Sequence, residues 1–246
     1  MTDTPADDFK IDLRSDVTVE LVKSSATDSD VLFAARVSTA GEQSLDELKK
    51  DPERSKGLIN YLMRDRHGSP FEHNSMTFFI SAPIFVFREF MRHRVGWSYN
   101  EESGRYRELQ PVFYVPDASR KLVQQGRPGK YVFVEGTPEQ HELVSRAMED
   151  SYVQAYRTYR EMLAAGVARE VARSVLPVGL YSSMYATCNA RSLMHFLGLR
   201  TQHELAKVPS FPQREIEMVG ERMEAEWARL MPLTYAAFNA NGRVAP

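Results

Sequence analysis

The stretch MTFFISAPIFVFREFMRHR, from Met76 to Arg94, changes from a strand pattern to a helix pattern within one run. Apolar side chains alternate from Met76 to Ile80, at the period of two that is typical of a strand with one buried face. Pro83 cannot donate a hydrogen bond to a neighbouring strand, so we expect the strand to stop there. The run from Ile84 to Arg94 reads as a helix entered through Pro83. A strand followed directly by a helix predicts a mixed fold.

The second half of the chain is predicted to be largely helical. Thr137 can cap a long helix, Pro138 fits its first turn, and Gln140 completes a capping box. Apolar residues then recur at three-to-four spacing from Val144 to Met162, which indicates one buried face. Gly166 is placed to end this helix.

Weaker patterns predict the remaining elements. These are a strand at Val17 to Leu21, helices over Asp30 to Val37 (with Ser29 as a cap) and Glu53 to Asp65, a strand in PVFYVP (111–116), a turn in QQGRPGK (124–130), and helices over Val167 to Leu176, Ala186 to Gly198 and Ser210 to Pro232. We therefore expect an α+β fold with a small antiparallel sheet, formed by one domain over residues 13–240 after a flexible tail at residues 1–12.

Composition limits the functional classes. The net charge of -2 lacks the basic excess of a general nucleic-acid binder. The longest apolar run, Phe78 to Phe87, is too short to cross a bilayer, and the polar, acidic start MTDTPADDFK is unlike a signal peptide. Cys188 is the single cysteine, so no intramolecular disulfide can form. These features predict a cytoplasmic protein without a membrane segment.

Cationic and polar side chains concentrate in RHRVGWSYNEESGRYR, from Arg92 to Arg107. Arginine forks, serine hydroxyls and the amides of a loop together suit a phosphate monoester. If the helix continues to His93, Arg88 and Arg92 share one face, and Glu89 shares another with His93. A solvated turn with surface ion pairs would explain the same composition.

Two other stretches carry candidate functional groups. HGSPFEH, from His67 to His73, offers two imidazoles and Glu72, but its spacing matches no common zinc motif. We expect Ser69 or His67 to cap a helix or line a pocket instead. Cys188 is expected to pack in the core. The P-loop, the dinucleotide-binding G-x-G-x-x-G and the G-x-S-x-G elbow are all missing from the sequence.

The cluster resembles the signature of the flavin-dependent thymidylate synthases, in which Arg-His-Arg is followed after seven residues by a serine within an N-E-x-S-G-R run. Further blocks resemble the family in its order over roughly residues 15–235, namely AARVS, PFEH, APIFVFREFMRHR, FYVP, REVARSVLP and NARSLMHFLGLR. The chain departs from the family pattern at two places. Eight residues, Val95 to Glu102, separate Arg94 from Ser103, and Glu89 stands where the family has glutamine.

The resemblance implies reductive methylation of deoxyuridine monophosphate (dUMP) to thymidylate, with methylenetetrahydrofolate as carbon donor and with FAD reduced by NADPH. It also implies a homotetramer. Arg200 matches the arginine that activates the pyrimidine by stabilising an anionic ring. No cysteine nucleophile is needed, so we expect Cys188 to be dispensable.

The resemblance also implies two sets of contacts and no metal ligand. The dUMP positions are Glu89, Arg92, Glu101, Glu102, Ser103, Gly104, Arg105, Arg173 and Arg200. The FAD positions are Ser38, His67, Ser69, Arg92, His93, Arg94, Glu101, Asn189, Ala190, Arg191 and His195.

Two readings from other classes remain open at this stage. A nucleic-acid-binding module could use the basic loop from Arg92 to Arg107, in which case binding would be salt-sensitive and no flavin would be bound. A metal-dependent hydrolase could be centred on His67, Glu72 and His73, and a chelator would abolish its activity. Both readings leave NARSLMHFLGLR unexplained.

Overall fold

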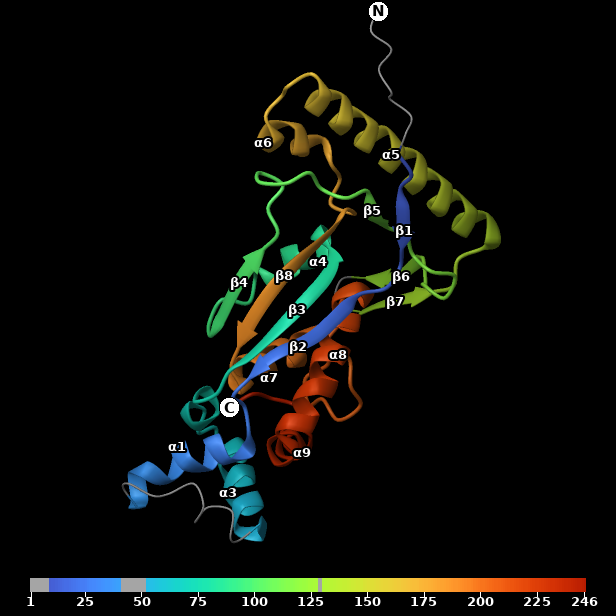
Figure 1. The fold of residues 1–246 in the computed structure, drawn as a ribbon. Coiled ribbons are helices and arrows are strands. Elements are labelled where there is room, and N and C mark those ends of the chain that lie inside the picture. The colour runs from blue at the N-terminus through green and yellow to red at the C-terminus, as the bar shows by residue number, and fades with distance from the viewer. Residues whose placement is uncertain (1–8, 41–51, 128–129) are drawn as a thin grey trace, which may run out of the picture. The chain divides into compact units, whose positions relative to one another are not determined.

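A computed structural model describes residues 9–40, 52–127 and 130–246 of the 246-residue chain. Figure 1 labels its elements. The strands are β1 (Asp12–Arg14), β2 (Thr18–Ser24), β3 (Met76–Pro83), β4 (Trp97–Glu101), β5 (Val112–Tyr114), β6 (Val123–Arg127), β7 (Lys130–Val134) and β8 (Tyr181–Cys188). The α-helices are α1 (Asp28–Ala40), α3 (Pro52–Arg64), α4 (Ile84–Phe90), α5 (Pro138–Ala164), α6 (Arg169–Ala172), α7 (Ala190–Arg200), α8 (Arg214–Leu230) and α9 (Pro232–Ala240). Two short 3₁₀ helices are η1 (Ser69–Glu72) and η2 (Arg173–Val175).

The chain divides into two compact units, each built from several segments. Unit 1 contains the described part of Met1–Asp16 together with Ser81–Arg88 and Glu101–Ser183. Unit 2 contains the described parts of Val17–Ile80, with Glu89–Asn100 and Met184–Pro246. The α+β class is confirmed, while the single domain over residues 13–240 stays a prediction.

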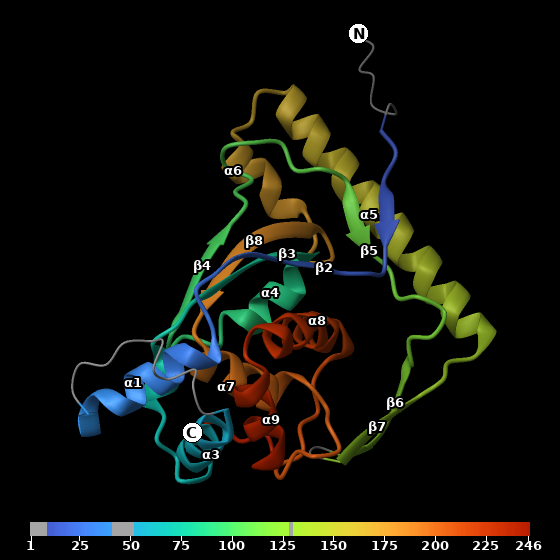
Figure 2. The same cartoon turned by 60° about the horizontal axis from the view of Figure 1, so that its bottom comes forward.

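A four-stranded sheet in the order β2-β3-β8-β4 supports unit 2. The predicted alternation in β3 is confirmed, because Met76, Phe78 and Ile80 are fully buried. Helix α8 packs against β2 and α7, and α9 packs against α8, which places these helices beside the sheet (Figure 2). Smaller pairs are the parallel β1–β5 and the antiparallel β6–β7. Most of the turn predicted at residues 124–130 belongs to β6 and β7, and residues 128–129 lie outside the described residues.

Helix α5 forms the core of unit 1, as the sequence predicted. Thr137 caps it, and the capping box with Gln140 is present in both directions. Gly166 follows the helix with φ of 81°, a conformation that glycine adopts without strain. Phe9 packs edge to face on Tyr156, and Ile11 is buried in the same core. The described end of the predicted tail is therefore packed, and residues 1–8 lie outside the described residues.

Two predictions near the cluster are wrong. The helix from Ile84 ends at Phe90, so Arg92 and His93 lie in a turn, and Arg88 and Arg92 do not share a helical face. The reason is a residue further along the chain, since Tyr99 Oη donates to the carbonyl oxygens of Phe90, at 3.1 Å, and His93, at 2.9 Å. These bonds satisfy acceptors that a longer helix would use. Residues Trp97–Glu101, predicted as loop, form the edge strand β4.

Other predicted boundaries also shift. The expected helix at Ala186 is strand β8, and α7 begins only at Ala190, because Asn189 Oδ1 accepts from the amide of Ser192 at 2.9 Å and caps the helix. Ser29 lies inside α1 and is not its cap.

At the C-terminal side, the helix predicted from Ser210 starts at Arg214. Pro232 begins a further helix, α9, that the sequence reading missed. Among the described residues no helix combines the length and the apolar character needed to span a membrane.

Candidate active site

Seven of the predicted flavin positions in unit 2 lie on or beside three neighbouring elements, and Arg92, His93 and Arg94 lie in the segment after α4. Ser38 is on α1, His67 and Ser69 lie at the start of η1, and Asn189 to His195 occupy the first half of α7. Because η1 packs against both α1 and α7, the fold brings these groups of residues together. Ser69 begins η1 without capping it, so the capping role predicted for Ser69 is wrong.

Arg191 is fixed on the surface that these elements share. Its Nη1 pairs with Glu72 Oε1 at 2.5 Å, and its Nε donates to the main-chain oxygen of Pro246 at 2.6 Å. A Cβ on Gly68 would lie 2.6 Å from Cζ of Arg191. The guanidinium therefore packs directly over a glycine that leaves room for it.

Helix α7 also fixes the turn after α4. Ser192 Oγ donates to the carbonyl oxygen of Val95 at 2.9 Å. Gly96 has φ of 69°, and a Cβ there would lie 2.1 Å from Ser192 Oγ, so no other residue fits. Arg92 and Arg94 flank this anchored turn with exposed side chains. Within the described part of the chain neither guanidinium has an ion pair, which leaves both able to bind an anion.

Arg200, at the end of α7, contacts two residues that follow each other closely in sequence. It forms a short ion pair with Glu89, and its Nε lies 3.1 Å from Nε2 of His93. The guanidinium is largely buried, with 15% of the side chain exposed. Glu89 and His93 thus converge on the predicted catalytic arginine, although no helix carries both.

The environment sets the charge states of this group. Burial first, and then the charges of Arg200 and His195, lower the pKa of His93 to about 4. Neutral His93 can therefore accept a hydrogen bond from Arg200 at Nε2 near pH 7. Burial also raises the pKa of Glu89, against the opposing pull of Arg200. One carboxylate oxygen of Glu89, Oε1, is buried and has no partner among the described residues.

Aromatic rings enclose His93. Its imidazole is 4.9 Å from the ring of Phe196, centroid to centroid, and 6.4 Å from the ring of Trp97. Trp97 itself stacks on Tyr99 with an interplanar angle of 12°. Trp97 is the first residue of β4 and lies between Arg94 and Ser103, where the chain has one residue more than the family signature, so this longer interval supplies part of the wall around His93.

Six of the predicted dUMP positions, Glu101–Arg105 and Arg173, lie in unit 1. A pocket of about 410 Å³ is lined by Glu101, Glu102, Gly104 and Arg173, together with Ser174 and Ser182. Gly104 is buried, and a Cβ there would meet Leu109 Cδ1 at 2.8 Å and Arg173 Cδ at 3.2 Å. The glycine thus allows the arginine to lie close to the loop backbone.

Two ion pairs and a turn shape the loop from Glu102 to Arg107. Glu102 pairs with Arg107 at 3.2 Å, and Arg105 pairs with Glu170 at 3.1 Å on an exposed surface. Ser103 Oγ accepts from the amide of Arg105 at 3.3 Å. Exposed pairs of this kind contribute little to stability, so an incoming anion can displace them.

The carboxyl group of Glu101 faces this pocket. The surrounding protein desolvates it and raises its pKa, although the residue as a whole is exposed. A hydrogen bond with Ser182 and the charge of Arg173 act in the opposite direction.

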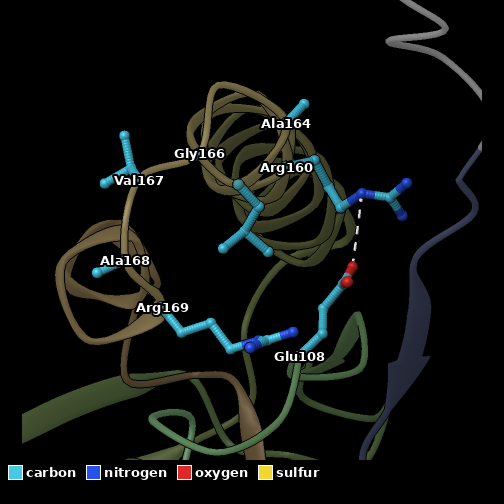
Figure 3. A pocket seen from close by; sticks show the side chains of 8 residues that line it. Glu108, Arg160, Ala164, Gly166, Val167, Ala168 and Arg169 are labelled. Carbon is cyan, nitrogen blue, oxygen red and sulfur yellow. Dashed lines mark ion pairs between the residues drawn. The ribbon is translucent and has the colours of Figure 1, made fainter.

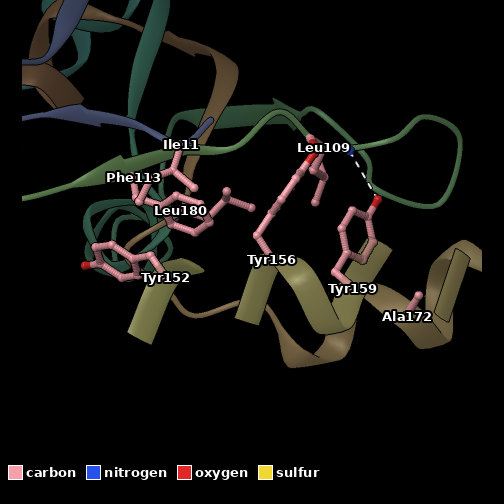
Figure 4. Close-up of a cluster of buried hydrophobic side chains, with 8 residues drawn as sticks. All are labelled: Ile11, Leu109, Phe113, Tyr152, Tyr156, Tyr159, Ala172 and Leu180. Carbon is pink, nitrogen blue, oxygen red and sulfur yellow. Dashed lines mark hydrogen bonds between the residues drawn. The ribbon is translucent and has the colours of Figure 1, made fainter. Parts of the chain in front are cut away.

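Two tyrosines of α5 form hydrogen bonds with the backbone of Leu109, in the loop that precedes β5 (Figure 4). Tyr159 Oη accepts from the amide of Leu109 at 3.2 Å, and Tyr156 Oη donates to the carbonyl oxygen of Leu109 at 3.0 Å. Leu109 in turn contacts Gly104. The long helix therefore fixes both backbone groups of one loop residue, and through it the floor of the pocket.

A second cavity of unit 1, of about 530 Å³, lies between the end of α5 and the start of α6 (Figure 3). Glu108 and Arg160 form an ion pair at 3.5 Å on its rim, and Arg169 points toward Glu108. None of the residues predicted to bind ligands lines this cavity, so its volume gives no reason to assign it to the reaction.

The two remaining candidates are the possible metal ligands of His67–His73 and the thiol of Cys188. Glu72 pairs with Arg191, and among the described residues no group of three or more His, Cys, Asp or Glu side chains is placed to hold a metal ion. Cys188 is buried at the end of β8, as predicted, and burial raises the pKa of its thiol.

Comparisons with known proteins agree with this arrangement. The family model described as thymidylate synthase complementing protein matches residues 20–233. A flavin-dependent thymidylate synthase of Streptomyces coelicolor is 93% identical over 246 residues, which cover 100% of both chains. The chain belongs to the flavin-dependent thymidylate synthase family. A second member, from Tropheryma whipplei, is 60% identical over 94% of this chain and 96% of its own.

Solved structures show the same fold in a second Streptomyces protein. The methylase PolB of Streptomyces cacaoi, described as a UMP/dUMP methylase bound with 5-Br dUMP, superposes with a TM-score of 0.90 at 59% identity. The match covers 96% of this chain and 100% of PolB.

The sequence analysis did not predict the partners of Arg200 and Arg191, because the family blocks do not show which residues these arginines contact. The convergence of Glu89 and His93 on Arg200 joins two distant segments, and the i,i+4 spacing of Glu89 and His93 was its one available signal. The contact between Arg191 and Pro246 had no signal in the sequence.

Proposed function

We propose that the chain catalyses the reductive methylation of dUMP to thymidylate, with methylenetetrahydrofolate as carbon donor and FAD reduced by NADPH. The observation that carries this proposal is the arrangement in unit 2. The predicted flavin positions on α1, η1 and α7 lie together, and α7 ends in the predicted catalytic Arg200.

The donors in unit 2 fit an anionic dinucleotide. Arg92 and Arg94 offer guanidinium groups without ion pairs among the described residues, and Arg191 offers one fixed at two of its nitrogens. Such forks bind phosphate oxygens with charge-assisted hydrogen bonds. When bound, the reduced flavin would supply the hydride for the new methyl group.

The pocket of unit 1 fits the phosphate of a nucleotide. Arg173 supplies charge and Gly104 an amide at the pocket wall, and Ser103, which precedes Gly104 in the loop, would supply a hydroxyl. Arg105 can turn from its exposed pair with Glu170 to the same phosphate. Each charge-assisted bond of this kind contributes about 1.5–3 kcal/mol.

Arg200 would act on the pyrimidine ring. Its positive charge, partly desolvated, would stabilise negative charge on the ring and leave C5 electron-rich enough to attack the methylene carbon. Neutral His93 orients the guanidinium through Nε2 without competing for the substrate as a cation. The buried thiol of Cys188 takes no part, because its raised pKa keeps it protonated.

The resemblance also supports a homotetramer with active sites built from several subunits. This assembly, the cytoplasmic location and the single catalytic domain over residues 13–240 remain predictions. Size-exclusion chromatography with light scattering measures the assembly directly.

An absorption spectrum tests the core of the proposal. Purified protein should absorb between 300 and 500 nm as a flavoprotein, and NADPH added with dUMP in the absence of oxygen should bleach it. Thymidylate formation is then measured with methylenetetrahydrofolate. Colourless protein that takes up no added FAD would contradict the proposal and would favour nucleic-acid binding by the basic loop.

The similarity to PolB raises one question about the substrate. Because that 59% identical protein is described as acting on UMP as well as dUMP, UMP is a second candidate substrate for this chain. Parallel assays with UMP and dUMP decide between them, and a ratio of kcat/KM near one would show that the 2′-hydroxyl is not discriminated.

A further inference from the structure

The last residues of the sequence form a segment tied tightly to unit 2. We call Arg243–Pro246 the C-terminal strap. Arg243 is buried, with 1% of its side chain exposed, and it pairs with both carboxylate oxygens of Glu224 at 2.6 and 2.8 Å. It also donates to Thr201 Oγ1 at 3.1 Å and Asn239 Oδ1 at 2.8 Å. Buried, bidentate pairs with further hydrogen bonds hold one geometry.

The backbone conformation at Gly242 and Arg243 sets the direction of the strap. Gly242 has φ of 74° and Arg243 has φ of 55°, so two successive residues take the left-handed conformation. A Cβ on Gly242 would lie 2.9 Å from Cβ of Lys207. An uncommon conformation at a non-glycine residue persists where its surroundings fix it, and the buried side chain of Arg243 does so here.

A second arginine holds the middle of the strap. Nη1 of Arg66 donates to the carbonyl oxygens of Val244 at 2.5 Å and Ala245 at 3.2 Å. Arg66 directly precedes His67, a predicted flavin position. The strap therefore runs along the segment that leads into η1.

The strap ends on Arg191. Pro246 is buried, and its main-chain oxygen accepts from Nε of Arg191 at 2.6 Å, while Glu72 accepts from Nη1. The two acceptors fix the plane of the guanidinium. For Nη2 the described residues provide no hydrogen-bond acceptor, so this nitrogen remains available to a ligand.

We propose that the C-terminal strap is a positioning segment for the flavin site, which holds the guanidinium of Arg191 with Nη2 directed at a phosphate of the bound dinucleotide. This inference rests on the proposed function, because it takes Arg191 as a flavin contact. The strap acts through Arg191 and does not itself touch the flavin. A preorganised guanidinium loses less side-chain freedom on binding, which increases affinity.

The test measures the dissociation constant for FAD by quenching of flavin fluorescence. A variant that ends at Arg243 keeps the buried anchor and removes the acceptor on Arg191. We expect it to bind FAD about tenfold more weakly, which corresponds to about 1.4 kcal/mol. Arg66→Ala releases the strap without shortening the chain and should weaken FAD binding in the same direction. Arg64→Ala, which removes an exposed pair with the adjacent Asp65, is the control and should change nothing.

A double-mutant cycle separates positioning from general destabilisation. If the strap acts through Arg191, shortening the chain in an Arg191→Ala background should cause no further loss of FAD affinity. Equal losses in both backgrounds would overturn the proposal, as would full FAD affinity in both the shortened chain and Arg66→Ala. Thermal unfolding of each apoprotein shows whether the shortened chain folds, and if it does not, Arg66→Ala alone supplies the cycle.

The experiment distinguishes failure of the proposed function from failure of the strap proposal. If the unaltered protein binds no FAD, the proposed function is wrong and the cycle has no starting point. If the unaltered protein binds FAD and forms thymidylate while the strap variants match it, only the strap inference is wrong.

Discussion

Arg200 and Glu89 form a largely buried ion pair in which the carboxylate neutralises the arginine proposed to activate the pyrimidine. Arg200 also donates from Nε to His93 and reaches the backbone carbonyl oxygen of Glu89 from Nη2 at 3.4 Å. All three nitrogens of the guanidinium thus face groups of this chain. A substrate that uses Arg200 must share it with Glu89 or displace that carboxylate.

Glu89→Gln should therefore strengthen productive substrate binding. The amide keeps the shape of the side chain and a hydrogen-bond acceptor for Arg200, but it removes the negative charge that competes with the pyrimidine. We expect a KM for dUMP lowered severalfold with FAD binding unchanged. Steady-state kinetics over a range of dUMP concentrations measure this, and a KM raised tenfold would show instead that the carboxylate itself binds the substrate.

Arg200→Ala should retain bound FAD and lose thymidylate formation. Removal of one preorganised charge at a reacting centre costs about 2.7–4 kcal/mol, or roughly 100- to 1,000-fold in kcat. The absorption spectrum checks that flavin is present, and the product assay gives the rate. Near-normal turnover in flavin-loaded Arg200→Ala would refute the role of this residue.

His93 should make stability depend on pH. Its pKa is lowered to about 4 in the folded protein, by burial first and then by the charges of Arg200 and His195, against about 6.5 when unfolded. Between these values the unfolded chain binds more protons, so the contribution is complete above pH 6.5 and is lost as pH falls toward 4. The raised pKa of Glu89 acts in the opposite direction.

Urea unfolding at several pH values measures this dependence. The free energy of unfolding of the unaltered protein should fall between pH 6.5 and 4.5, and His93→Gln should show a shallower fall over the same interval. His195 has a lowered pKa and remains in both proteins, so it does not account for the difference. Parallel curves for the two proteins would mean that His93 does not titrate as proposed.

The sequence predicted the elements whose signals are local. The helix α5 has its cap, its proline, its apolar face and its terminal glycine within the helix and its two ends, and each is found in place. The alternation in β3 is equally local. Such patterns succeed because capping and periodic burial depend on near neighbours along the chain.

The sequence failed where distant residues decide the structure. Trp97–Glu101 has a loop composition, but pairing with β8 makes it a strand. Arg92 and His93 leave the helix because Tyr99, several residues later, takes up the free carbonyl groups. The family resemblance named Arg191 and Arg200 as site residues, yet their partners Pro246 and Glu89 follow only from the fold.

Cys188→Ala should leave activity intact. The thiol is 3% exposed at the end of β8 and protonated, so it is a packing group in the core. We expect a loss of about 1 kcal/mol in the free energy of unfolding, typical of a small buried substitution. Thymidylate assays on flavin-loaded protein check this, and a folded, flavin-loaded but inactive variant would overturn it.

Gly68→Ala should weaken the flavin site while largely sparing the fold. The new Cβ would lie 2.6 Å from Cζ of Arg191, so the guanidinium must move and lose its bonds to Glu72 and Pro246. The backbone of Gly68 has φ of -78°, which alanine adopts without strain, and the obstructing atoms belong to the end of a flexible side chain. We expect FAD to bind about tenfold more weakly, a loss of about 1.4 kcal/mol.

Gly57→Ala is the matched control for that change. Gly57 lies within α3, where a Cβ would meet no atom within 4 Å, and alanine in a helix is more stable than glycine by about 1 kcal/mol. This variant should therefore unfold at a higher temperature and bind FAD normally. Fluorescence titration with FAD and thermal unfolding of both variants give the comparison. Unchanged FAD affinity in Gly68→Ala would show that the position of Arg191 does not limit flavin binding.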